Sequence, residues 1–85
     1  MKEKSISEAI MLKAEEVLSE FESLVRTYAV GECIEAYEAR SRLAMKNPDT
    51  NYTDSAFSKA INSTIRFGLI DLRVDGETYY FVRMA

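Results

Sequence analysis

Apolar and polar residues alternate on both sides of Asp75-Gly76, and this pattern restricts the fold more than any other part of the sequence. Residues 69–83 therefore predict two strands joined by a tight turn, because Asp-Gly favours the turns that connect antiparallel strands. Pairing Val74 with Glu77 would place four apolar side chains on one face: Ile70, Leu72, Tyr79 and Phe81. A lone hairpin is marginally stable in water, so helices, or a short third strand at residues 28–30, must cover that face.

Three segments before the hairpin have the apolar periodicity of helices, namely residues 6–28, 32–45 and 53–67. The third is the best delimited, because Thr53 is a good N-cap and Gly68 a good helix terminator. Its apolar positions share one face: Phe57, Ala60, Ile61, Thr64 and Ile65. In the second helix we expect Cys33 or Ile34, Tyr37, Leu43 and Ala44 to point inward.

This order of elements predicts a single domain over residues 1–85 of the α+β class, mainly α. Three helices followed by a hairpin is the order of a winged-helix domain. In such a domain the segments at 32–45 and 53–67 form a helix-turn-helix, and the hairpin at 69–83 is the wing. The main alternative is a helical hairpin with an added β-ribbon that enters no groove of DNA.

The sequence also resembles the winged-helix superfamily in its local pattern, at Val30, Ile34–Tyr37, Tyr52–Phe57, Phe67-Gly68 and the Asp75-Gly76 turn. Residues 30–68 are similar to the C-terminal winged-helix module of viral and plasmid primase-helicases, although only Tyr37 of that family's tyrosine pair is present. The resemblance implies a small DNA-associated module of a phage or mobile element, and it implies no catalytic residue.

Composition excludes several classes of function. The chain has no His and a single Cys, which excludes Cys/His zinc sites and catalysis by Ser-His-Asp or Cys-His groups. Neither glycine-rich phosphate-binding motif occurs. We therefore expect no enzyme, no metal and no cofactor, with an enzyme that uses only carboxylates as the alternative. No apolar run is long enough to cross a bilayer or to form the core of a signal peptide, so we expect a cytoplasmic protein.

The predicted third helix carries a polar stripe of the residue types that contact DNA: Ser55, Ser58, Lys59, Asn62 and Arg66. In a helix-turn-helix this face would enter the major groove of double-stranded DNA. We expect additional contacts from the wing and from the end of the second helix, namely from Arg73, Arg40, Arg42 and Lys46. Arg83, at the far end of the wing, is a further candidate for phosphate contact. This predicts a DNA-binding transcriptional regulator or replication accessory.

The charge distribution leaves another function open. The net charge is −3, and residues 1–39 alone have four basic against nine acidic side chains, a net charge of −5. An acidic total disfavours non-specific binding of nucleic acid. The second hypothesis is therefore a winged-helix module that binds a protein and no DNA, because fold alone does not determine function. An acidic mimic of DNA is a third, less favoured reading.

The predicted first helix, with Ser5 and Glu8 as a capping box, would be longer than so small a domain can cover. Its apolar stripe therefore predicts a symmetric homodimer through residues 6–28, using Ile10, Ala14, Val17, Phe21 and Leu24. The competing outcome is a helix bent or ended near Glu15-Glu16, which would hide the stripe inside one chain.

Overall fold

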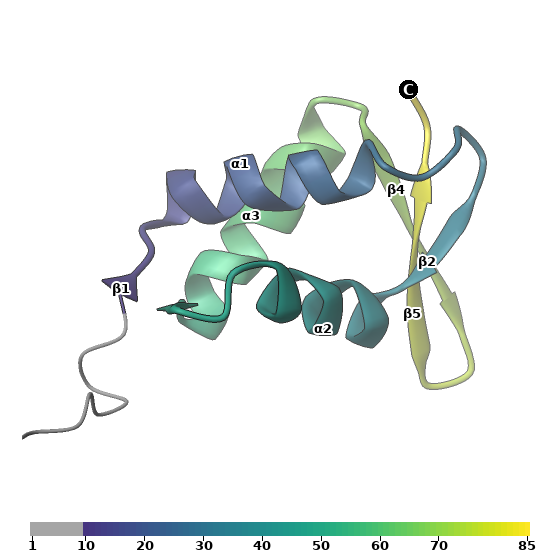
Figure 1. Cartoon of the computed structure of the whole chain (residues 1–85). Coiled ribbons are helices and arrows are strands. Elements are labelled where there is room, and N and C mark those ends of the chain that lie inside the picture. Colours follow the sequence, from purple (N-terminus) through teal and green to yellow (C-terminus); the bar gives the residue numbers. More distant parts are fainter. Residues whose placement is uncertain (1–9) are drawn as a thin grey trace, which may run out of the picture.

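Three helices pack on one side of a small antiparallel sheet in the computed structural model, which describes residues 10–85 (Figure 1). The elements follow in the order β1 (Ile10–Met11), α1 (Ala14–Val25), β2 (Cys33–Glu35), α2 (Ala36–Lys46), β3 (Thr50–Asn51), α3 (Asp54–Arg66), β4 (Ile70–Asp75) and β5 (Thr78–Arg83). The predicted α+β class is confirmed.

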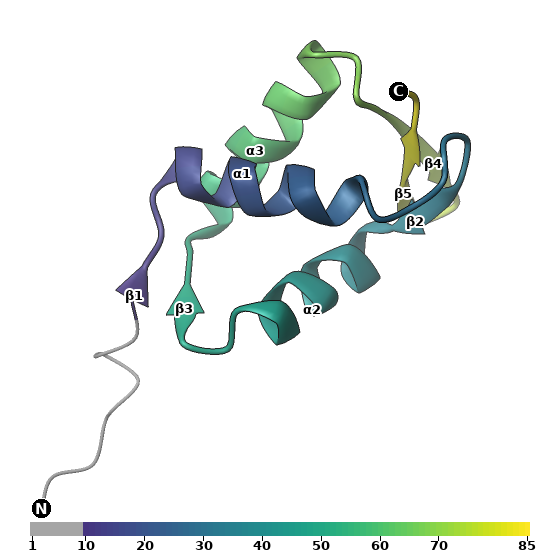
Figure 2. The same cartoon turned by 45° about the horizontal axis from the view of Figure 1, so that its top comes forward.

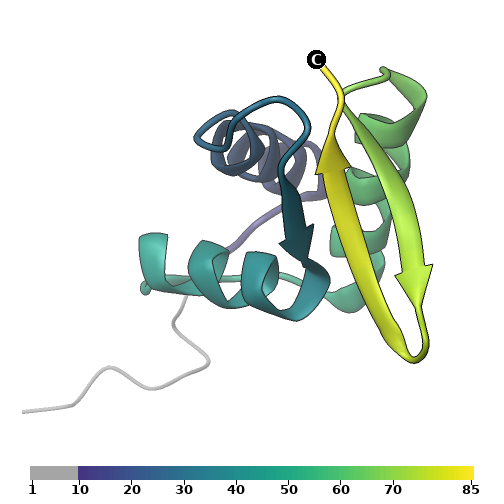
Figure 3. The same ribbon diagram turned by 90° about the vertical axis from the view of Figure 1, so that its right-hand side faces the viewer.

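The sheet has the order β2-β5-β4, so the last strand of the chain lies in its centre (Figure 3). Strand β2 is short and pairs antiparallel with one half of β5, with Ile34 opposite Phe81. Strand β4 pairs with β5 along its whole length. The half of the hairpin nearest the turn therefore projects beyond the part of the sheet that β2 covers.

A cluster of aromatic rings joins the helices to the sheet. The ring of Phe21 on α1 is fully buried and meets Phe57 of α3 and Phe81 of β5 edge-on, at centroid distances of 5.7 and 5.4 Å. Edge-to-face pairs of this kind add to the stabilisation that burial provides. Helix α1 packs on α3 through this cluster, and the cluster fixes α3 relative to the hairpin.

The predicted long helix over residues 6–28 is wrong at both ends. Helix α1 begins at Ala14 and ends at Val25, whereas Ile10–Met11 form a strand that runs parallel to β3 (Figure 2). The amide of Ile10 donates to the carbonyl of Asp49, and the amide of Leu12 donates to that of Asn51. These long-range bonds satisfy the backbone that a helix would have satisfied locally. The capping box and residues 6–9 lie outside the described residues.

The predicted second helix starts too early, because Cys33–Glu35 form β2 and α2 begins only at Ala36. This strand replaces the third strand expected at residues 28–30. Its central residue, Ile34, is buried in the core and the flanking Cys33 is exposed. Tyr37, expected to point inward, is 81% exposed. The inward residues of α2 are Ala39 and Leu43, while Ala44 is exposed.

The third helix and the hairpin are confirmed. Helix α3 spans Asp54–Arg66 with Thr53 as its N-cap, and β4 and β5 fall within residues 69–83. The strand register differs from the prediction, because Val74 pairs with Tyr79 instead of Glu77. Gly76 has φ +66° and no other residue in the turn has positive φ, which is the requirement of a turn with glycine at its first central position. The faces of the strands are unaffected by this shift.

Candidate nucleic-acid interface

Helix α3 is held in place from its inner side. Phe57, Ala60 and Thr64 are buried against α1 and the sheet. The buried hydroxyl of Thr64 is hydrogen-bonded, because it lies within donor distance of the carbonyls of Ala60 and Ile61. The N-terminus of α3 is fixed by the Thr53 hydroxyl, which accepts a hydrogen bond from the amide of Ala56 at 3.0 Å. The opposite face is consequently presented in one orientation.

All five predicted DNA-contacting residues of α3 are exposed: Ser55, Ser58, Lys59, Asn62 and Arg66. The only acidic residue of the helix is Asp54, in its first turn. Within residues 10–85 no carboxylate lies within ion-pair distance of Lys59 or Arg66. These two cations are therefore available to an anionic ligand.

A shallow groove of about 410 Å³ runs between this face and the start of α1. Lys59, Asn62, Ser63 and Arg66 line one wall, and Ala14, Glu15 and Leu18 line the other. The Glu15 carboxylate faces the two cations across the groove without pairing with either. Its negative charge lowers the positive potential within the groove.

Arg40 has a structural role that the sequence did not reveal. Its Nη2 lies 2.5 Å from Oδ1 of Asp54, and its guanidinium stacks over the rings of Phe57 and Tyr52 at 5.1 and 5.4 Å. The hydrogen bond to Asp54 raises the pKa of the Arg40 guanidinium, against a smaller opposing effect of burial. Arg40 thus joins α2 to the N-terminus of α3, and its charge is already balanced.

The two other candidate cations of α2 contact the α1 side of the molecule. Arg42 pairs with Glu38 at 2.7 Å and lies over the ring of Tyr28, 5.6 Å from its centroid. Lys46 lies 3.8 Å from Glu20 of α1. The structure therefore does not bring Arg42 and Lys46 onto the exposed face of α3.

The wing carries little free positive charge. The Nε of Arg73 lies 2.9 Å from Oδ2 of Asp71, and Asp75 and Glu77 flank the turn.

The inward-facing side of the hairpin exposes apolar side chains beyond the core, with Leu72 40%, Val74 59% and Tyr79 55% exposed. This exposed apolar surface was not predicted from the sequence. It could have been, because each hairpin strand is longer than any third strand that the rest of the sequence offers to cover it.

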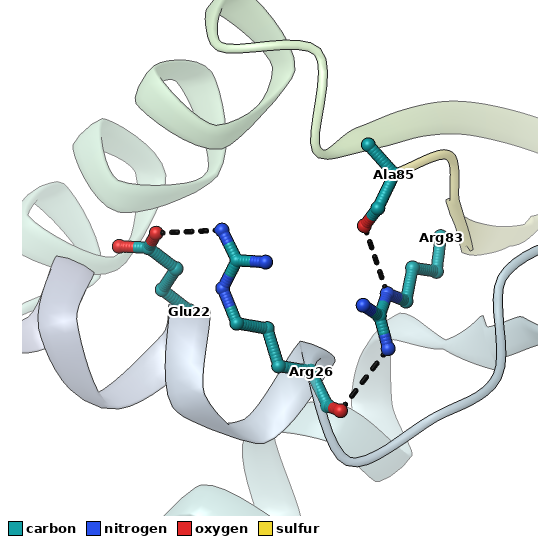
Figure 4. A network of polar contacts seen from close by, with 4 residues as sticks. All are labelled: Glu22, Arg26, Arg83 and Ala85. Atoms are coloured by element: carbon teal, nitrogen blue, oxygen red, sulfur yellow. Dashed lines mark hydrogen bonds and ion pairs between the residues drawn. The ribbon is translucent and has the colours of Figure 1, made fainter.

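Arg83 is occupied by the protein itself. Its Nη1 donates to the carbonyl of Arg26, and its Nε donates to the main-chain oxygen of Ala85 at 2.9 Å (Figure 4). The same Nη1 also donates to the carbonyl of Tyr28. Arg26 is the C-cap of α1 and itself pairs with Glu22 at 3.1 Å. The expected phosphate contact of Arg83 is thus replaced by a clamp between the end of α1 and the end of β5.

The residues predicted for the dimer interface are mostly in the core. Val17, Phe21 and Leu24 are buried within the domain, so their predicted use in a dimer interface is wrong. Ala14 is half-buried beside the groove, and Ile10 is 63% exposed in β1. Helix α1 starts only at Ala14, next to the Glu15-Glu16 position of the competing outcome, and this late start shortens the apolar stripe until one chain covers it. The homodimer itself stays a prediction.

No helix between residues 10 and 85 is both long and apolar enough to cross a membrane. Within the same range, no three His, Cys, Asp or Glu side chains are grouped so as to hold a metal ion. No protein-family model, curated protein or solved structure matches this chain.

Proposed function

We propose that this chain is a winged-helix protein that binds double-stranded DNA through the exposed face of α3, as a transcriptional regulator or replication accessory. The topology supports the fold. A strand, β2, lies between the first two helices and joins the edge of the hairpin to give the sheet order β2-β5-β4. Helices α2 and α3 then form the helix-turn-helix, and β4 and β5 form the wing.

The observation that carries the DNA-binding proposal is a pair of cations on α3 that have no ion-pair partner among residues 10–85. Lys59 and Arg66 project from the same exposed face as Asn62, with no carboxylate on the helix between Ser55 and Arg66. Lys and Arg bind phosphates or guanine, and Asn can bond two atoms of adenine. A helix surface with this composition suits the negative, hydrogen-bonding floor of the major groove.

The remaining charges restrict how DNA would be held. The wing turn carries Asp75 and Glu77, and Arg73 is paired with Asp71, so the proposed interface centres on α3. With a net charge of −3, long-range attraction to DNA is weak, and affinity depends on the local contacts of Lys59 and Arg66.

Titration of fluorescent duplex DNA at several salt concentrations tests the proposal. Loss of both cations in Lys59→Ala/Arg66→Ala should weaken binding and lower the salt dependence by about two units of slope, roughly one per phosphate contact. Arg26→Ala removes one positive charge at the far end of α1 and is the control. No binding by the wild type at low salt, or equal binding by the double variant, would refute the proposal.

A second candidate is a winged-helix module that binds a protein. It is favoured by the neutralised cations, since Arg40, Arg42 and Arg73 each pair with a carboxylate, and by the exposed Leu72 and Val74 of the wing. This candidate predicts that Val74→Asp abolishes binding to the partner protein, whereas Lys59→Ala/Arg66→Ala has no effect on it. DNA binding through α3 predicts the opposite sensitivity.

A further inference from the structure

Strand β4 is an open edge of the sheet. In the described part of the chain β4 pairs only with β5. Residues of an antiparallel strand alternate between bonding their neighbour and facing away from it. The amide of Leu72 donates to Oδ1 of its neighbour Asp71 at 2.9 Å, so Leu72 faces away from β5, and by alternation Ile70 and Val74 do too. These outward groups have no strand partner among residues 10–85, and such an edge can template another strand, in which case the Leu72 amide would leave the Asp71 carboxylate for a carbonyl of that strand.

The sequence of this edge is complementary to itself. When a second copy of β4 is laid antiparallel with Leu72 opposite the partner's Leu72, Asp71 falls opposite the partner's Arg73, and Arg73 opposite the partner's Asp71. In the same register Ile70 falls opposite the partner's Val74. The three residues with outward backbone groups then all meet outward residues of the other copy. Register, charge and hydrogen bonding therefore agree on one arrangement.

The charges at this edge would form a closed cluster. Asp71 and Arg73 already pair within one strand at 2.9 Å, on the face of the sheet opposite the core. The second copy would place an identical pair beside them in reversed order, so every carboxylate would have a guanidinium on either side. Oppositely charged residues directly across an antiparallel pair stabilise it, whereas like charges destabilise it.

The apolar side of the same strand also lacks a cover. Leu72 is 40% and Val74 59% exposed, although Ile70 and Phe81 on the same face are buried. Phe67, three residues before Ile70, is 64% exposed. The proposed register brings the partner's Val74 beside Ile70, at the end of the strand that follows Phe67. A second copy thus supplies apolar neighbours to side chains that the described part of this chain leaves exposed.

We propose that β4 is a homodimer interface in which two chains pair antiparallel about Leu72 and form one continuous sheet. The occupant of the edge is a second copy of this chain, because its sequence matches itself in charge and polarity. This interface takes the place of the one expected on α1. It uses none of the α3 residues proposed to contact DNA, so it stands or falls independently of DNA binding.

Sedimentation velocity of the full chain, from micromolar to sub-millimolar concentration, is the test. The wild type should approach twice the chain mass of 9.7 kDa. Asp71→Arg and Arg73→Asp should each raise the dissociation constant at least about tenfold, because twofold symmetry sets like charges opposite each other at two places. Glu77→Arg makes the same change of charge outside the register and should still dimerise.

An equimolar mixture of the Asp71→Arg and Arg73→Asp chains should form a heterodimer. Arginines of one chain would then face aspartates of the other, which no pairing within a chain can imitate. Val74→Pro removes an outward amide and should block the dimer while sparing the β4–β5 bonds. Circular dichroism verifies that each variant is folded. A monomeric wild type, single variants that dimerise like the wild type, or a mixture that stays monomeric would each overturn the proposal.

Discussion

Replacing Arg83 by methionine tests whether this residue clamps two ends of the fold or is free for DNA. Methionine keeps an unbranched side chain of similar reach but removes every donor. The wild-type guanidinium donates to the carbonyls of Arg26 and Tyr28 and to the main-chain oxygen of Ala85. The carbonyl of Arg26 belongs to the C-terminus of α1, where the last helical carbonyls have no intrahelical partner.

The expected loss follows from the burial of these acceptors. The bonds to Arg26 and Ala85 are exposed, so water replaces them at little cost. The bond to Tyr28 is partly buried, and a hydrogen bond to a charged group contributes about 1.5 kcal/mol or more. A cation at a helix C-terminus adds about 0.5 kcal/mol. The free energy of unfolding should therefore fall by about 2 kcal/mol, which lowers Tm by about 10 °C in a domain of this size.

Urea and thermal unfolding followed by circular dichroism measure this loss. Arg26→Met is the matched control, because it also removes an arginine at this end of α1 but breaks only an exposed pair with Glu22, worth about 0.3–0.5 kcal/mol. The salt dependence of any DNA binding should be the same for Arg83→Met as for the wild type. A stability loss no larger than that of the control, or a lower salt dependence, would refute the clamp and return Arg83 to the DNA interface.

Three further substitutions probe the parts of the fold that position α3. Phe21→Ala removes the ring that meets Phe57 and Phe81, and a loss of about 3–5 kcal/mol should leave much of the chain unfolded in a urea titration; retained stability would mean that Phe21 is not central to the core. Thr53→Ala should lower Tm by about 4–8 °C through loss of the N-cap bond, whereas Ser55→Ala, which caps nothing, should leave it unchanged; equal effects would contradict the cap. Gly76→Ala places a side chain at φ +66° and should cost about 1 kcal/mol in the same assay; an unchanged midpoint would show that the turn relaxes freely.

Local sequence was sufficient for α3 and the hairpin. The limits of α3 follow from Thr53, whose hydroxyl satisfies an amide that the helix leaves free, and from Gly68, which has φ +81° just beyond the helix. The side-chain faces of β4 and β5 follow from strict alternation. The predicted faces are correct although the predicted register is wrong. The observed pairing differs from the predicted one by two residues, and a shift by two leaves every side chain on the same face of the strand.

Tertiary structure decided the start of α1 and the nature of residues 33–35. Ile10–Met11 have the spacing of a helix but bond to β3, and Cys33–Glu35 read as helix but complete the sheet beside β5. Strand pairing depends on the position of a segment that is distant in sequence, and local sequence does not determine that position. The covering of Val17 and Phe21 by the rest of the domain follows from the same arrangement.

The residue types on the exposed face of α3 could be predicted from the sequence, because helical periodicity fixes the faces once Phe57 and Ala60 are buried. Which cations have an ion-pair partner within residues 10–85 depends on how the helices pack. Arg40 and Lys46 meet Asp54 and Glu20, which are distant in sequence, whereas Lys59 and Arg66 meet none of the described carboxylates. An ion pair requires two side chains within a few ångströms, and that proximity exists only after the chain has folded.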